Sequence, residues 1–277
     1  MPGLNDPGGV ENNKNMQKYL AIIDEKTASI VALCVAITWL CFRYEFGFDL
    51  NVTLFSIAVI FPLVFTIREA FKKRDSIIKL LSIFKASLNS VYYAFASNRK
   101  LSEQDIQQVA EHLTAISHIF FEALKGGVYE PAEVREKTNE IFEFLQKNQD
   151  VISNGVVMKT IRFLQDVNES MENTVGLKLH GTPISLRAYC LVFIYIFPFI
   201  FIPTLTFDLA ASPPWVVYVL AIIHGFILIS LYNVQYDMED PFDQVGLDDI
   251  KLEEFHFDKT VEPQATQGAQ DAGVGLP

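Results

Sequence analysis

The side chains with the most functional potential in this sequence form a row in an uncharged segment: Thr53, Ile57, Phe61 and Phe65. They recur at every fourth residue, so on a helix they lie above one another on one face. Several copies of this row around an axis would form a hydrophobic constriction that gates a pore by dewetting. Phe has an electropositive ring edge, so rings turned edge-on to the axis would favour an anion over a cation. The same spacing is also typical of aromatic residues that face lipid or pack in a core.

Two further features of this segment bear on a pore. Basic residues follow the row and would raise the concentration of anions at its inner mouth: Arg68, Lys72 and Lys73. Pro62 lies beside Phe61. Inside a membrane helix, proline is tolerated only where the backbone groups that it frees find partners or a cavity.

No set of residues in the sequence has the spacing of a catalytic or metal site. The five His residues are not spaced with Cys or carboxylates as metal ligands are, and neither a glycine-rich phosphate loop nor Gly-x-Ser-x-Gly occurs. Three Cys residues lie within apolar runs, where a thiol behaves as a small hydrophobic group: Cys34, Cys41 and Cys190. We therefore predict that the protein is not an enzyme and has no cofactor.

The apolar residues collect in four runs, which comprise residues 28–42, 50–67, 188–207 and 215–232. A helix needs about 20 apolar residues to cross a hydrocarbon core of roughly 30 Å. Core helices of a large soluble protein are the alternative interpretation. It is disfavoured because the runs form two adjacent pairs, each joined by a short loop. The sequence therefore predicts an all-α membrane protein with four transmembrane helices in two hairpins.

The charges predict the orientation of these helices. The loops 46–49 and 208–214 contain no Lys or Arg, whereas basic residues flank the other ends of the second and third runs. The positive-inside tendency then places both termini and the central segment on the cytoplasmic or stromal side, in a membrane that the sequence does not identify. The net charge is −11, and eleven acidic and two basic residues lie within 236–277. This distribution lacks the basic face of a nucleic-acid-binding protein.

Residues 68–187, between the hairpins, are predicted to form a cytoplasmic helical domain. One helix continues from the second span, and the next begins at Ser102, with Asp105 in the capping-box position, and ends at Gly126-Gly127. Pro131 suits the first turn of a third helix, and a fourth covers roughly residues 155–171. Periodicity does not reveal whether the apolar stripes pack within one chain or against a neighbouring subunit.

The remaining segments complete the predicted domain organisation. An N-terminal segment, 1–26, precedes the first hairpin, 27–67, and the second hairpin covers 188–234. The acidic C-terminal segment, 235–261, is expected to be a solvated, mobile face. The Gly-, Gln- and Ala-rich tail, 262–277, is expected to be disordered.

The sequence resembles the bestrophin family over nearly all of residues 20–255. Three local matches, which occur in the same order as in the family, carry this resemblance. The family's Ile/Phe/Phe neck, with the Ala-Tyr-x-Arg stretch after it, is similar to Ile57-x3-Phe61-x3-Phe65 followed by Ala70-Phe71-Lys72-Lys73-Arg74. The Thr-Pro-Ile-Pro segment of bacterial members resembles Gly181-Thr182-Pro183-Ile184. The acidic Pro-Phe-Gly motif after the family's last span resembles Glu239-Asp240-Pro241-Phe242.

This resemblance implies a homopentamer in a lipid bilayer, in which the second helices line a central anion pathway. The permeant ion would be chloride or another monovalent anion, with bicarbonate as a further candidate, and the sequence does not distinguish chloride from bicarbonate or nitrate. The resemblance places the neck at Ile57, Phe61 and Phe65, and a second, cytoplasmic constriction near Thr182 and Pro183. A membrane-anchored scaffold that uses the helical domain and the acidic tail is the alternative function. An ion-coupled transporter would need an acidic residue within a span, and none occurs.

The sequence also departs from the family's pattern. The family's Arg-Trp-Trp-Glu is Lys73-Arg74-Asp75-Ser76, and Asp243 replaces the Gly after Pro-Phe. In animal members an acidic cluster after this motif binds calcium, but here Val245 stands where its first carboxylate would fall. The candidate calcium ligands that remain are Asp240, Asp248 and Asp249. Because calcium prefers six to eight oxygen ligands, calcium gating is not expected. The chain resembles a divergent member, closer to microbial or plastid forms than to animal ones.

Overall fold

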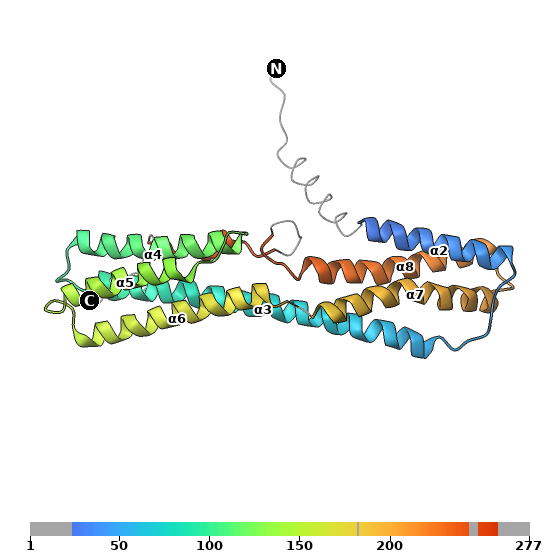
Figure 1. Ribbon diagram of the computed structural model, residues 1–277, viewed down its shortest axis with the longest axis horizontal. Helices are drawn as coiled ribbons and strands as arrows, with labels where there is room; N and C mark the ends of the chain where they lie inside the picture. The colour runs from blue at the N-terminus through green and yellow to red at the C-terminus, as the bar shows by residue number, and fades with distance from the viewer. Residues whose placement is uncertain (1–23, 182, 244–248, 260–277) are drawn as a thin grey trace, which may run out of the picture. The chain divides into compact units, whose positions relative to one another are not determined.

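The structure is a computed structural model, and it describes residues 24–181, 183–243 and 249–259. The regular secondary structure of the described residues is entirely helical and includes no β-strand (Figure 1), which confirms the predicted all-α class. In chain order the helices are α2 (Glu25–Arg43), α3 (Thr53–Ala96), α4 (Glu103–Leu124), α5 (Pro131–Lys147), α6 (Asn154–Leu179), α7 (Ile184–Asp208) and α8 (Pro214–Asp237), followed by the 3-10 helix η1 (Leu252–Phe255).

Four parts of the chain contain a helical segment long and apolar enough to cross a membrane: Glu25–Arg43, Thr53–Ala96, Asn154–Asp208, which contains α6 and α7, and Pro214–Asp237. Each contains one of the four predicted runs, except that α3 begins only at Thr53 rather than at Leu50. There the Thr53 amide donates to Asn51 Oδ1 at 3.0 Å, so a side chain pairs one of the free amides at the helix start. The chain is an integral membrane protein.

The chain divides into two compact units, and the first comprises Met1–Ser76 and Leu179–Ile250. Within it, α2 packs against α7 and α8, and α7 packs against α8. Residues from all four membrane helices form its buried core: Ile30, Val59, Leu63, Cys190, Ile194, Phe197, Leu228, Ile229 and Tyr232. The three Cys thiols are free and buried, which confirms their interpretation as small core side chains.

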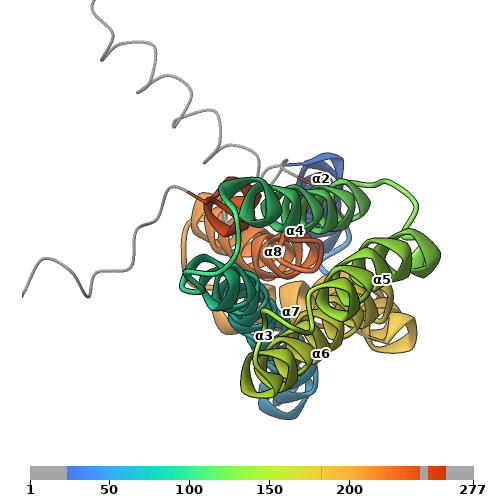
Figure 2. The same ribbon diagram turned by 90° about the vertical axis from the view of Figure 1, so that its left-hand side faces the viewer.

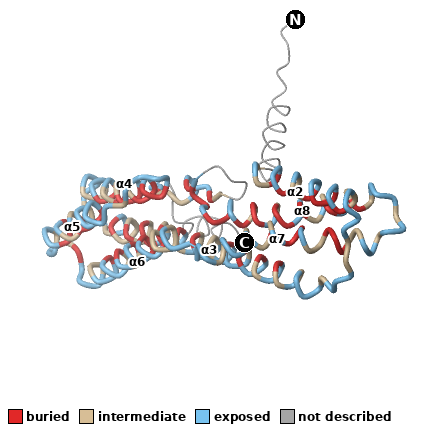
Figure 3. Tube along the Cα trace, turned by 45° about the vertical axis from the view of Figure 1, so that its right-hand side comes forward, coloured by how far each residue is buried: buried red, intermediate tan, exposed pale blue. Residues whose placement is uncertain are grey.

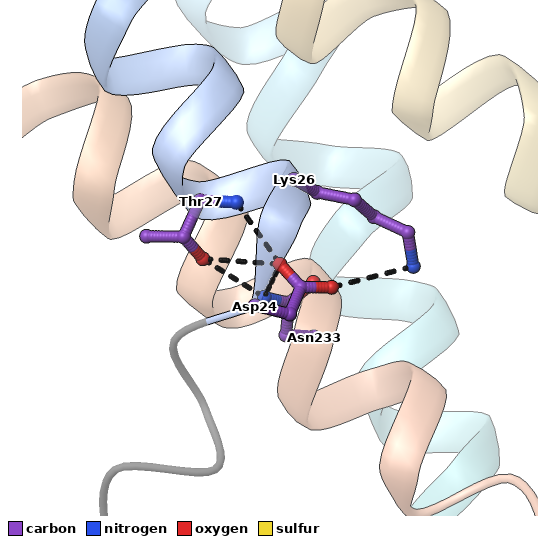
Figure 4. A network of polar contacts seen from close by, with 4 residues as sticks. All are labelled: Asp24, Lys26, Thr27 and Asn233. Atoms are coloured by element: carbon purple, nitrogen blue, oxygen red, sulfur yellow. Dashed lines mark hydrogen bonds and ion pairs between the residues drawn. The ribbon is translucent and has the colours of Figure 1, made fainter.

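Asp24 joins the start of α2 to the last turns of α8 (Figure 4). Its Oδ1 accepts hydrogen bonds from the Thr27 amide at 2.9 Å and from Asn233 Nδ2 at 3.0 Å. Lys26 Nζ lies 3.6 Å from Asp24 Oδ2 and 4.5 Å from the centroid of the Tyr236 ring. The carboxylate therefore pairs a free amide of α2 and also fixes two helices that are far apart in the sequence.

The second unit comprises Ile77–Lys178 and Lys251–Pro277, so it includes the later part of α3 together with α4, α5 and α6 (Figure 2). Phe84 of α3 packs against Phe120 and Phe121 of α4, with ring centroids 4.7 and 5.7 Å apart. The predicted capping box is confirmed: Ser102 Oγ accepts the Asp105 amide, and Asp105 Oδ2 accepts the Ser102 amide. Pro131 is the first residue of α5, as predicted.

Two expectations for the second unit are corrected by its packing. The fourth helix continues to Leu179 rather than ending near Met171, because Thr174 is buried and Lys178 Nζ donates to the Leu124 carbonyl at the end of α4 at 2.7 Å. The acidic segment is not wholly a solvated face: Leu252 is fully buried, and the Phe257 amide donates to Ser117 Oγ of α4 at 3.1 Å. The predicted disordered tail, 262–277, lies outside the described residues.

Candidate functional site: an exposed row on α3

The predicted neck residues lie on an exposed face of α3. Ile57 is 47% exposed, Phe61 58% and Phe65 51%. Val59 and Leu63, on the opposite side of the helix at about 100° per residue, are 3% and 1% exposed. Figure 3 colours the tube by burial and shows buried and exposed positions interspersed along the helices. One face of α3 therefore packs into the core of the protomer, and the described residues leave the row about half exposed.

The two aromatic residues of the row contact each other. The Phe61 and Phe65 ring centroids are 5.7 Å apart, and the ring planes are tilted by 58°. Pro62 lies within α3, where its ring removes the amide that would donate to the Ala58 carbonyl. The row therefore presents a continuous apolar strip beside a point where the backbone hydrogen bonding of the helix is interrupted.

Two of the three predicted inner-mouth residues continue the face of the row. Arg68 and Lys72 are exposed, and the helical repeat places them within about 80° of Ile57, as it does Phe61 and Phe65. Lys72 Nζ forms an exposed ion pair with Glu69 Oε1 at 2.8 Å. An exposed pair of this kind contributes little to stability, so the ammonium group remains able to approach a passing anion.

The third predicted inner-mouth residue, Lys73, has a different environment. The repeat turns it about 100° from Lys72, and its Nζ donates to the backbone carbonyl of Glu239 at 2.8 Å. Lys73 lies beyond the predicted span, which ends at Ile67. Burial lowers the pKa of its ammonium group, although Glu239 and Asp240 act in the opposite direction. The structure therefore brings together the row, Arg68 and Lys72, but directs Lys73 towards the segment after α8.

Of the predicted second constriction, the structure describes only Pro183; Thr182 lies outside the described residues. Pro183 is exposed and is the N-cap residue of α7. Its carbonyl accepts the Leu186 amide at 2.9 Å and the Arg187 amide at 3.3 Å. The role of this turn as a constriction stays a prediction.

The acidic motif after α8 is folded into the first unit. Asp240 Oδ1 accepts the Phe242 amide at 3.3 Å, Phe242 is buried, and the Ile250 amide donates to the Pro241 carbonyl at 3.0 Å. Asp248 lies outside the described residues. Within the ranges that the structure describes, no three His, Cys, Asp or Glu side chains gather closely enough to hold a metal ion.

Sequence reasoning missed a polar contact made by the same motif. Glu239 Oε2 accepts hydrogen bonds from Arg187 Nη1 at 3.0 Å and from Gln235 Nε2 at 3.1 Å. The available signal was Gln235, a polar residue that comes shortly after the fourth apolar run. It is buried in the structure, and buried polar side chains require hydrogen-bond partners.

Comparisons with known proteins identify the fold. A scan against protein-family models finds no match, and neither does a search of curated proteins. Solved structures do match. A bacterial bestrophin homologue from Klebsiella pneumoniae with one substitution aligns with a TM-score of 0.67 at 15% identity, and the alignment covers 83% of this chain and 95% of that chain. Another structure of a bestrophin homologue from this organism, solved by zinc phasing, gives 0.66 at 14% identity and covers 83% and 92%.

A third solved structure, described as a membrane protein with one substitution, aligns with a TM-score of 0.69 at 14% identity. That alignment covers 84% of this chain and 95% of the other. The similarity therefore extends over most of both chains, although few residues are identical. The chain has a bestrophin-like fold, at low sequence identity to the solved structures.

Proposed function

We propose that this chain is the subunit of an anion-selective channel of the bestrophin type, with a pathway lined by α3. The observation that carries the proposal is the exposed apolar row, Ile57, Phe61 and Phe65, which is followed on the same face by Arg68 and Lys72. Apolar residues alone would suit a lipid-facing surface. A face that passes from apolar rings to cations instead suits a dewetting constriction with an anion-concentrating mouth.

The pathway requires more than one copy of the chain. A single row on one helix encloses no pore, so several copies must place α3 around a common axis. The bestrophin-like fold and the motif resemblance support a homopentamer in which five rows face that axis. The mass of the complex, solubilised in detergent, tests this assembly directly: five chains of 31.3 kDa are expected. A monomer or dimer would contradict the proposed pathway.

Passive conduction follows from the composition of the row. The described part of the pathway holds no acidic side chain that could bind and release a proton within the membrane. The rings can stabilise a partly dehydrated anion only through their electropositive edges. Chloride and bicarbonate are the proposed permeant ions, with both termini and the helical domain on the cytoplasmic or stromal side.

Ion flux into liposomes tests the proposed function. Purified protein in liposomes should dissipate an imposed chloride gradient, and it should leave a potassium gradient intact when no permeant anion is present. Protein-free liposomes and liposomes that contain heat-denatured protein are the controls.

The membrane scaffold makes the opposite prediction for this assay. Liposomes with correctly folded protein would then show no more flux than empty ones. Removal of residues 236–277 would abolish the binding of a partner rather than alter conduction.

A further inference from the structure

Glu239 joins three membrane helices at one end of the first unit. The residue follows α8 and is 8% exposed. Its carboxylate accepts hydrogen bonds from Arg187 Nη1 of α7 at 3.0 Å and from Gln235 Nε2 of α8 at 3.1 Å. Its backbone carbonyl accepts a hydrogen bond from Lys73 Nζ of α3 at 2.8 Å. We call these four residues the Glu239 cluster.

Gly181 allows the carboxylate of this cluster to reach the start of α7. A Cβ atom at position 181 would lie 2.7 Å from Glu239 Oε1 and 3.5 Å from its Cδ. Carbon and oxygen atoms that are not bonded do not approach to 2.7 Å without displacement. Glu239 therefore packs directly on Gly181, two residues before Pro183, the N-cap residue of α7.

The cluster also contacts α3, through a side chain that lies outside the face of the neck row. Lys73 follows Phe65 by about two helical turns, and the helical repeat places it about 80° to 160° from the residues of the row. A bond from Lys73 to a fixed carbonyl therefore restricts the rotation of α3 about its own axis. That rotation determines the direction in which Ile57, Phe61 and Phe65 face.

The geometry of the cluster depends on the negative charge of the Glu239 carboxylate. Hydrogen bonds in which one partner is charged are stronger than neutral ones. If the carboxylate were neutralised, the guanidinium of Arg187 would lose its counter-charge in a largely buried site and would move towards water. Such a movement would shift the start of α7, and the cluster would no longer hold the carbonyl that receives Lys73.

We propose that Glu239 is a positioning residue for the anion pathway, which sets the rotation of α3 and the location of the start of α7. This inference rests on the proposed function and assigns the cluster a role in it. The cluster thereby fixes the width of the pathway at the level of Phe61 and Phe65.

The test compares Glu239→Gln and Gly181→Ala with a matched control. Glu239→Gln keeps the size of the side chain and removes its charge. Gly181→Ala keeps every charged group and displaces the carboxylate through the added Cβ. Glu25→Gln is the control, because it makes the same change of charge at an exposed residue. Glu25 is the first residue of α2, and the neighbouring Asp24 joins this helix to the end of α8.

The readout is the permeability of gluconate relative to chloride, measured from reversal potentials. This ratio does not depend on the amount of folded protein, so a loss of stability alone would not change it. We expect a several-fold rise in the ratio for Glu239→Gln, a smaller rise for Gly181→Ala and the wild-type value for Glu25→Gln. Because the clash needs the Glu239 carboxylate, Gly181→Ala should have no further effect when Glu239 is already Ala.

The outcomes distinguish the positioning role of Glu239 from the proposal that the chain forms an anion channel. If the wild-type protein conducts anions but both cluster variants keep its permeability ratio, the positioning role is wrong and the channel proposal stands. If Glu239→Gln does not fold, Gly181→Ala decides the question alone, and an unchanged ratio in that variant overturns the inference. If the folded wild-type protein conducts no anion, the proposed function and the positioning role fail together.

Discussion

Gly225 of α8 faces Cys34 of α2 so closely that a Cβ atom at position 225 would lie 2.7 Å from Cys34 Sγ. The next nearest atom, Ile30 Cγ1, would lie 3.7 Å away. In a membrane the hydrophobic effect does not drive helices together, so close packing through small residues supplies much of the association energy. The contact between α2 and α8 therefore depends on the missing side chain of Gly225.

A larger side chain at this position should separate the two helices. Gly225→Leu is expected to destabilise the protein by roughly 1–3 kcal/mol through overpacking, and Cys34→Ala in the same chain should recover part of that loss. Thermal unfolding in detergent measures both effects. Gly176→Leu in α6 is the matched control, because a Cβ there meets nothing within 4 Å. Equal melting temperatures for Gly225→Leu and Gly176→Leu would contradict the close approach.

Loss of the capping box at the start of α4 should destabilise the second unit. Ser102→Ala removes the acceptor of the Asp105 amide, and a lost cap of this kind costs about 1 kcal/mol. Ser102→Asp retains an acceptor and should stay close to the wild type. Chemical denaturation followed by circular dichroism provides the measurement. An unchanged unfolding midpoint in Ser102→Ala would show that the cap contributes nothing to stability.

The capping box and the start of α5 at Pro131 could be predicted because their signals are local. A cap depends on two side chains three residues apart, and a span depends on an uninterrupted run of apolar residues. The length of α6 could not be predicted in this way. Its last turns are held by the bond from Lys178 to the end of α4, a partner more than fifty residues away.

In the candidate site, too, local features could be predicted from the sequence and contacts between distant residues could not. The spacing of Ile57, Phe61 and Phe65 placed them on one face, and burial of Val59 and Leu63 decides that this face is exposed in the protomer. Lys73 is adjacent to Lys72 in the sequence, but a helix separates neighbouring side chains by about 100°, so the two lysines have different environments. The Glu239 cluster joins residues from three helices, and periodicity within one helix carries no information about such contacts.

Acid should loosen the C-terminal segment at His256. This imidazole packs against the Phe121 ring, with centroids 4.3 Å apart, and lies 3.4 Å from Ser117 Oγ. Burial lowers the pKa of His256 below its ordinary value of 6.5; the nearby Lys125 and His118 act in the same direction, and Glu253 and Glu122 oppose them. A detached His256 therefore binds a proton more readily than the packed one. The stabilisation is present above pH 6.5 and is lost as the pH falls through the lowered pKa.

Hydrogen exchange of the Phe257 amide, which donates to Ser117 Oγ, reports this loosening. Its protection factor, corrected for the intrinsic effect of pH, should fall as the pH is lowered from about 7.5 to 5. His256→Gln cannot titrate in this range and should show a flat profile. A wild-type protection factor that stays constant over the same range would refute the coupling.

The most direct test of the central claim is the single-channel conductance of a protein in which Phe61 and Phe65 are both replaced by Ala. Removal of two rings from each neck row should widen and wet the constriction, and we predict a several-fold higher chloride conductance. Phe55→Ala is the matched control: it removes a 42% exposed ring from the same helix at about 160° from Ile57, so conductance should stay at the wild-type value. A double variant that conducts as the wild type does would contradict a pathway lined by this row.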